Sequence, residues 1–237
     1  MNGNDVSALV FDTFGTLVDW RGSLIAELTA FGRARNIPAD WAAFTDAWRA
    51  GYQPAMEPVR TGRRPFTKLD VLHRETLDRL VKEFSIAGLS EADLQHLNRG
   101  WHRLKPWPDV VPGLTRLKKK FIIAPLSNGN TSLLLNMAKN AGMPWDTVLG
   151  SDALRAYKPM PEAYRGMAEF LDLPVERVML VAAHNGDLGA AQKQGLRTGF
   201  IPRPQEYGPH QERDTSATGK WDIVADSLEE VATQLGV

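Results

Sequence analysis

The chain contains 237 residues, which is enough for one large domain or for a core domain with an insertion. Lys plus Arg and Asp plus Glu both number 28, so the formal net charge is zero and supplies no overall field for binding nucleic acid or an anionic membrane. Cysteine is absent, which excludes disulfides, thiolate metal ligands and a cysteine nucleophile. No apolar run approaches the ~20 residues that cross a bilayer, and the N-terminus shows no secretory signal. We therefore expect a cytoplasmic globular protein without nucleic-acid or membrane partners.

The chain opens with a short apolar run. Residues 7–12, SALVFD, end in a carboxylate followed by a Thr/Gly turn, which predicts a buried strand that opens into a loop. From residue 19 to residue 107 no strand is expected. Apolar residues recur there at helical spacing over residues 24–34, 44–52, 69–81 and 89–104. The last stretch begins at Ser90 with Asp93 three residues later, a pattern typical of a helix N-terminus.

Beyond residue 107, short apolar runs alternate with helical patterns. Strands are predicted at residues 121–126, 178–183, 198–202 and 221–224. Helices are predicted at residues 132–141, 161–171, 187–194 and 228–235. This alternation is typical of right-handed βαβ units, so we expect an α/β fold with a doubly wound, Rossmann-like parallel sheet and an inserted all-helical region. The polar stretch 204–220 is predicted to be a surface loop.

Polar side chains follow the predicted strands, at the points where ligands bind in open parallel sheets. The first strand is followed by Asp12, Thr13, Phe14 and Thr16, the second by Ser127 and Asn128, and the third by His184 and Asp187. Lys158 and Tyr164 lie between the last two of these strands along the chain. We therefore expect a carboxylate, a small polar pair, a lysine and a second acidic group to face one crevice.

These motifs resemble those of the haloacid dehalogenase (HAD) superfamily. Its members carry an aspartate after the first strand, Ser or Thr after the second, a Lys, and acidic residues after a later strand. Here FDTFGTL, LSNGN, YKPMPEAY and VAAHNGD occupy these places. The resemblance covers nearly the whole chain and implies the HAD fold, with a core domain of residues 1–18 and 108–237 and a helical cap domain of residues 19–107.

Two features favour one branch of the superfamily. HAD phosphatases carry a second aspartate two residues after the nucleophile, which protonates the leaving group and helps to hold Mg²⁺, and Phe14 at that position can do neither. Trp48-Arg49 matches a Trp-Arg pair in the cap of L-2-haloacid dehalogenases. The chain therefore resembles an (S)-2-haloacid dehalogenase, a hydrolase without metal or other cofactor that converts short 2-haloalkanoic acids to 2-hydroxy acids and halide. Homodimers are common in that family, so the resemblance makes a homodimer a candidate assembly.

The resemblance implies a role for each catalytic residue. Asp12 attacks the carbon that bears the halogen and forms an ester. Lys158 keeps Asp12 ionised, and Thr16 orients it by a hydrogen bond. Asp187 activates the water that cleaves the ester. Arg49 solvates the leaving halide, the alternative being a solvated charge on a helix face.

The substrate-binding residues are expected on the same loops. Ser127 and the backbone N–H groups of the first loop, which contains Thr13 and Phe14, bind the substrate carboxylate. Asn128 helps to solvate the halide, and Tyr164 forms a hydrogen bond at the edge of the site. Ser127 and Asn128 have an alternative role as a cap of the following helix.

One motif departs from the best-known dehalogenases. They have Ser-Ser-Asn where this chain has Ala182-Ala183-His184, so both hydroxyls are missing. Because His exchanges a proton near neutral pH, His184 is expected to position or activate the hydrolytic water with Asp187, the alternative being a structural histidine. Two other functions stay open: a HAD-type small-molecule phosphatase that needs Mg²⁺, and a non-catalytic HAD-fold binding protein.

Overall fold

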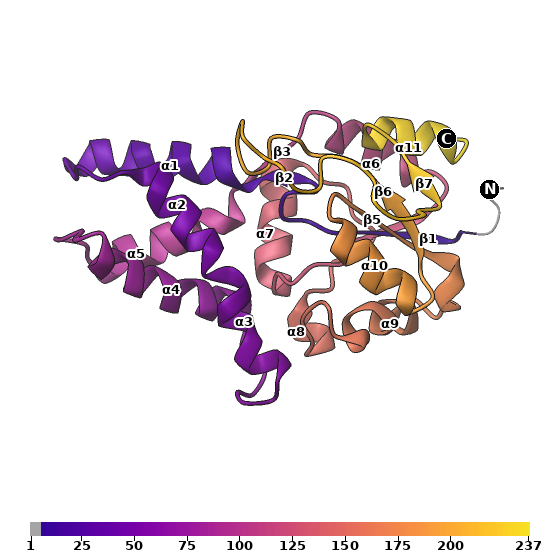
Figure 1. Ribbon diagram of the computed structural model, residues 1–237, viewed down its shortest axis with the longest axis horizontal. Helices are drawn as coiled ribbons and strands as arrows, with labels where there is room; N and C mark the ends of the chain where they lie inside the picture. The colour runs from indigo at the N-terminus through magenta and orange to yellow at the C-terminus, as the bar shows by residue number, and fades with distance from the viewer. Residues whose placement is uncertain (1–5) are drawn as a thin grey trace.

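A five-stranded parallel sheet forms the centre of the protein, whose computed structural model describes residues 6–237 (Figure 1). The strands are β1 (Ala8–Phe11), β4 (Ile122–Pro125), β5 (Val178–Ala182), β6 (Arg197–Phe200) and β7 (Ile223–Val224). Their order is β4–β1–β5–β6–β7, so the first strand lies between two strands that come much later in the chain. The predicted doubly wound parallel sheet is confirmed, and each predicted strand lies within two residues of its expected ends.

Strand β1 is buried on both faces, and its side chains alternate between two hydrophobic cores. Leu9 and Phe11 belong to one core, and Ala8 and Val10 belong to the other. The helices that cover the sheet are α6 (Val110–Leu117), α7 (Thr131–Ala141), α9 (Pro161–Phe170), α10 (Asn185–Lys193) and α11 (Leu228–Gln234). Figure 1 shows α6 and α11 on one side of the sheet and α9 and α10 on the other. Burial on both faces explains why the strand sequence is uniformly apolar.

Between β1 and β4 the chain leaves the sheet and forms a helical region (Figure 1). It enters and leaves through an antiparallel ribbon of β2 (Val18–Asp19) and β3 (Lys105–Pro106). The helices are α1 (Trp20–Arg35), α2 (Trp41–Ala50), α3 (Tyr52–Arg60), α4 (Leu69–Glu83), α5 (Glu91–Asn98) and the 3-10 helix η1 (Arg99–His102). The prediction of no strand here is wrong at the ribbon, because two-residue strands show no alternating pattern. Residues 1–5, which begin the predicted core segment, lie outside the described residues.

Two predicted helices are each divided in the structure. The pattern over residues 44–52 belongs to α2 and α3, which meet at Gly51. A Cβ atom on Gly51 would lie 2.6 Å from Thr76 Cγ2 of α4, so glycine permits this close packing. The pattern that begins at Ser90 forms α5 and then η1 rather than one helix, and its predicted cap is present, since Ser90 Oγ accepts the N–H of Asp93 at 3.2 Å.

The polar stretch 204–220 is irregular, as predicted, but it does not stay on the surface. Glu206 within it is 1% exposed, and Arg203 just before it is also buried. The stretch follows the carboxyl end of β6. In a parallel sheet this end lies on the same side as the carboxyl end of β1, where Asp12 lies. In residues 6–237, no helix combines the length and the apolar character that crossing a membrane requires.

Candidate active site

The side chain of Asp12 lies at the carboxyl end of β1, where three groups contact its two oxygens. Lys158 Nζ donates to Oδ1 at 2.8 Å, and Thr16 Oγ1 donates to Oδ2 at 2.6 Å. His184 Nδ1 lies 3.1 Å from Oδ2. Thr16 is itself held, since its Oγ1 accepts the N–H of Ala183 at 2.9 Å. The carboxylate is therefore fixed in position from both sides.

The charges around Asp12 keep it ionised. Burial raises the pKa of Asp12, but the Lys158 ammonium and the His184 ring lower it by more, so this pKa lies well below its usual value. Burial lowers the pKa of Lys158, but the attraction of Asp12 and Asp187 raises it by more. The pair is therefore a carboxylate beside an ammonium at neutral pH.

A second carboxylate, Asp187 on α10, extends this chain of polar contacts. Its Oδ2 accepts a hydrogen bond from Lys158 Nζ at 2.5 Å, and its Oδ1 accepts one from the Tyr164 hydroxyl at 2.7 Å. Burial and the charge of Asp187 raise the pKa of Tyr164, which keeps the phenol protonated. Both oxygens of Asp187 are thus engaged.

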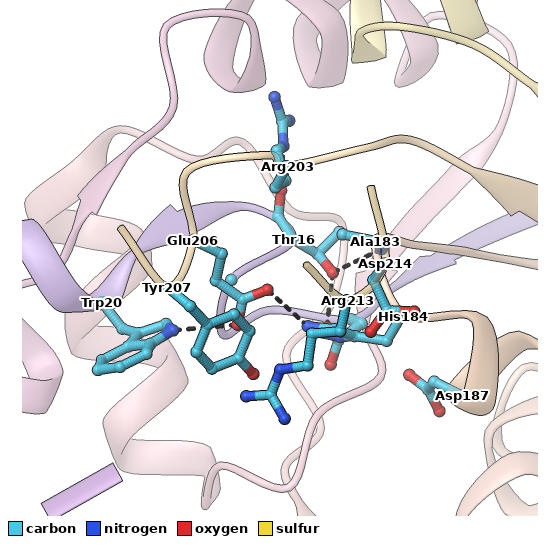
Figure 2. A network of polar contacts seen from close by, with 12 residues as sticks. Thr16, Trp20, Ala183, His184, Asp187, Arg203, Glu206, Tyr207, Arg213 and Asp214 are labelled. Atoms are coloured by element: carbon cyan, nitrogen blue, oxygen red, sulfur yellow. Dashed lines mark hydrogen bonds and ion pairs between the residues drawn. The ribbon is translucent and has the colours of Figure 1, made fainter. Parts of the chain in front are cut away.

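His184, the N-cap residue of α10, lies between two carboxylates (Figure 2). Its Nδ1 faces Asp12, and its Nε2 lies 2.8 Å from Glu206 Oε2. Burial lowers the pKa of His184, but its hydrogen bonds with Asp12 and Glu206 raise it by more, so the ring is an imidazolium at neutral pH. Glu206 also accepts a hydrogen bond from Trp20 Nε1 at 3.0 Å. Glu206 therefore connects His184 to the first residue of the helical region.

Arg49, near the end of α2, reaches the site from the helical region. Its guanidinium carbon lies 5.2 Å from the ring centre of Trp20 and 4.4 Å from that of Tyr52. Its Nη2 lies 3.8 Å from Glu206 Oε1, and its buried Nη1 has no hydrogen-bond partner among residues 6–237. Because a guanidinium keeps its charge when it is buried, Arg49 brings a positive charge to the cavity wall, with an N–H group that has no partner among the described residues.

Phe14 and Asn128 lie on the wall of the cavity beside Asp12. Phe14 packs edge-on against Tyr52, with ring centres 6.1 Å apart. Asn128 Oδ1 accepts the backbone N–H of Lys158 at 2.7 Å, which leaves the side-chain NH₂ as a donor. An apolar ring and an amide donor thus adjoin the carboxylate.

Thr13 and Ser127 are buried but are not part of the cavity wall. Thr13 Oγ1 has no hydrogen-bond partner among residues 6–237. Ser127 Oγ accepts the N–H of Gly129 at 3.2 Å, so it stabilises its own turn. These two predicted substrate-binding side chains are therefore not among the residues that line the cavity.

The cavity has a volume of about 290 Å³ and opens between the sheet edge and helices α2 and α3. Its lining residues are Asp12, Phe14, Arg49, Tyr52, Gln53, Asn128, Lys158, Pro159, Tyr164, His184, Gly186, Asp187, Tyr207, Arg213 and Asp214. Of the predicted catalytic residues, Thr16 alone lies behind the lining. In the described part of the chain, no group of three or more His, Asp and Glu side chains is arranged to hold a metal ion.

Several residues of the site were not predicted from the sequence. They are Tyr52 on α3 and, on the loop after β6, Glu206, Tyr207, Arg213 and Asp214. The loop follows the fourth predicted strand, so the polar residues at its start are the signal that points to it. Nothing in the polar composition of the loop distinguishes the buried Glu206 from exposed residues such as Gln205.

The sequence and the fold are both similar to those of known proteins. A family model described as haloacid dehalogenase-like hydrolase matches residues 6–195. The crystal structure of a defluorinating L-2-haloacid dehalogenase is 50% identical and covers 100% of this chain and 99% of its own, with a TM-score of 0.96. The (S)-2-haloacid dehalogenase 4A of Burkholderia cepacia is 27% identical over 97% of this chain and 99% of its own length. An L-2-haloacid dehalogenase from Xanthobacter autotrophicus, with chloropropionic acid covalently bound, shares the fold at 24% identity and a TM-score of 0.79, over 97% of this chain and 98% of its own. The chain therefore belongs to the haloacid dehalogenase-like hydrolase family.

Proposed function

We propose that the protein hydrolyses short (S)-2-haloalkanoic acids to 2-hydroxy acids and halide. The observation that carries the proposal is the ionised Asp12 on the cavity wall, next to the apolar ring of Phe14. Halide is a leaving group that needs no proton, so its displacement by a carboxylate requires no acid at the position of Phe14. The relatives described as L- or (S)-2-haloacid dehalogenases support the substrate class.

In the first half-reaction, Asp12 attacks C2 of the substrate. Its Oδ2 already interacts with Thr16 and His184, whereas Oδ1 accepts one hydrogen bond, from Lys158. Because each carboxylate oxygen has two lone-pair sites, Oδ1 keeps one for the carbon, and we assign Oδ1 as the attacking atom. The C2–halogen bond breaks as the O–C2 bond forms, which leaves an ester on Asp12.

The departing halide needs donors that are not already engaged. Arg49 Nη1 has no partner among residues 6–237, and the Asn128 NH₂, which interacts with the Tyr52 hydroxyl, has a second N–H to donate. Both residues lie on the cavity wall. We assign them to the halide, since donors fixed before the reaction stabilise the developing charge without reorganisation.

In the second half-reaction, water cleaves the ester at the carbonyl carbon of Asp12. Esterification removes the negative charge that faces Nδ1 of His184, which lowers the pKa of the ring and allows Nδ1 to release its proton to the solvent. Glu206 holds the Nε2–H group, so Nδ1 then accepts a proton from the attacking water. That proton passes to the product alcohol oxygen as it leaves. The second proton of the water passes from the new Asp12 carboxyl group to Nδ1, which restores the carboxylate and the imidazolium. We therefore assign water activation to His184, and to Asp187 the positioning of Lys158.

Halide release tests the proposal. We expect release from chloroacetate and from (S)-2-chloropropionate in the presence of EDTA, with (R)-lactate as the product of the second because direct attack inverts C2. The Asp12→Asn variant should release no halide, because an amide is a poor nucleophile. Asp172→Asn, a change at an exposed carboxylate away from the cavity, serves as the matched control. Mg²⁺-dependent turnover of p-nitrophenyl phosphate without halide release would instead identify a phosphatase.

A further inference from the structure

A cation on the cavity wall has no acidic partner. Arg213 lies on the loop between β6 and β7 and lines the cavity together with Asp12. Its guanidinium carbon lies 3.6 Å from the ring centre of Tyr207. Within residues 6–237 it forms no ion pair, whereas Lys158, His184 and Arg49 each contact a carboxylate at 3.8 Å or less.

Contacts within the loop hold Arg213 in this place. Gln211 Oε1 accepts the N–H of Tyr207 at 2.9 Å, and Gln211 Nε2 donates to the carbonyl of Arg213 at 2.8 Å. The neighbouring Asp214 accepts the backbone N–H and the side-chain NH₂ of Asn185, each at 2.9 Å. Figure 2 shows the side chains of Arg213 and Tyr207 next to each other. The adjacent carboxylate is thus engaged elsewhere, and the guanidinium stays available.

The charges around the cavity show what Arg213 contributes. The acidic groups are Asp12, Asp187, Asp214 and, just behind the wall, Glu206, and the other cations are Lys158, His184 and Arg49. These groups carry one net negative charge, and Arg213 makes the set neutral. Both reactants, Asp12 and a haloacid, are anions, so a negative site would repel the substrate that it has to bind.

We propose that Arg213 binds the carboxylate of the substrate and thereby selects haloacids over neutral halogenated compounds. The inference rests on the proposed function and adds a charged side chain to the backbone N–H groups of the first loop that are expected to bind the carboxylate. A guanidinium binds a carboxylate through two parallel hydrogen bonds, and the ring of Tyr207 holds its plane. Ser127, the side chain predicted for this role, is uncharged and is not among the lining residues, whereas Arg213 carries a charge and lines the cavity.

Steady-state kinetics of Arg213→Gln and Arg213→Lys test the proposal. For (S)-2-chloropropionate we expect the KM of Arg213→Gln to rise ~10- to 100-fold with kcat almost unchanged, because a charge-assisted pair is lost in both the ground state and the transition state. Lysine should restore part of the loss. The KM for neutral (S)-2-chloropropionamide should not change. Arg155→Gln is the matched control, since Arg155 is also exposed and lies over an aromatic ring, that of Phe66, outside the cavity.

Calorimetric binding of propionate, which has no halogen, separates this inference from the proposed function. We expect propionate to bind wild-type protein and Arg155→Gln, and to bind Arg213→Gln ~10- to 100-fold more weakly, whether or not halide is released. Equal propionate affinity in all three proteins overturns the inference, as does the absence of binding to wild-type protein. An equal rise in KM for acid and amide also overturns it. If wild-type protein releases no halide but binds propionate in a way that depends on Arg213, the proposed function is contradicted and the inference about Arg213 stands.

Discussion

Among single residues, His184 is the position where a substitution is expected to stop ester hydrolysis but leave halide release intact. Replacing it by Gln removes the proposed base but leaves Asp12, Lys158 and Arg49 in place. We therefore expect His184→Gln to release about one equivalent of halide per enzyme and then to stall as the Asp12 ester, with kcat reduced ~10²- to 10⁴-fold. Rapid quenching followed by mass spectrometry of the intact protein measures the ester. Asp187→Asn should instead slow ester formation, and fast turnover without ester in His184→Gln would refute the assignment.

Another residue, His73, makes stability depend on pH. It is buried against Trp101 with ring centres 4.3 Å apart, and neither ring nitrogen has a partner among residues 6–237. Burial lowers its pKa from 6.5 to about 3. The unfolded chain therefore binds a proton that the folded chain does not, and stability falls as the pH drops from 6.5 toward 3. Between pH 7 and pH 5, urea unfolding should show wild-type protein losing about 2 kcal/mol more than His73→Phe. Equal losses would contradict this.

At the level of elements, Arg203 anchors the loop after β6. Its Nη1 and Nη2 donate to the two carboxylate oxygens of Asp109 at 2.8 and 2.9 Å, and its Nε donates to the carbonyl of Thr16 at 2.9 Å. Removing a buried partner of this kind costs about 3 kcal/mol, so Arg203→Gln should lower the free energy of unfolding by that amount and weaken activity. Arg64→Gln, which breaks an equally bidentate but exposed pair with Glu75, should cost less than ~1 kcal/mol. Similar losses in both variants would argue against an anchor.

For the whole molecule, the sequence could predict the sheet and about half of the cavity wall. Buried apolar strands have a clear pattern, and their carboxyl ends meet at one edge. The residues of the cavity wall that follow those ends are Asp12, Phe14, Asn128, His184 and Asp187. It could not predict the ribbon of β2 and β3, whose strands are too short to show a period. The burial of Glu206 could not be predicted either, because Glu206 packs against Trp20, which lies 186 residues earlier in the chain. A contact between residues so far apart in the sequence leaves no local pattern in an otherwise polar loop.

The position of β1 between β4 and β5 has a consequence for the order in which the protein is assembled. During synthesis Asp12 emerges early, but Lys158 follows 146 residues later and His184 follows 172 residues later. Strand β1 has no neighbour until residues 122–125 exist, and it is complete on both edges only once residues 178–182 have been made. The helical region, whose contacts are more local, is synthesised whole before either event. Asp12, the proposed nucleophile, is thus made well before the strands and side chains that surround it in the folded protein.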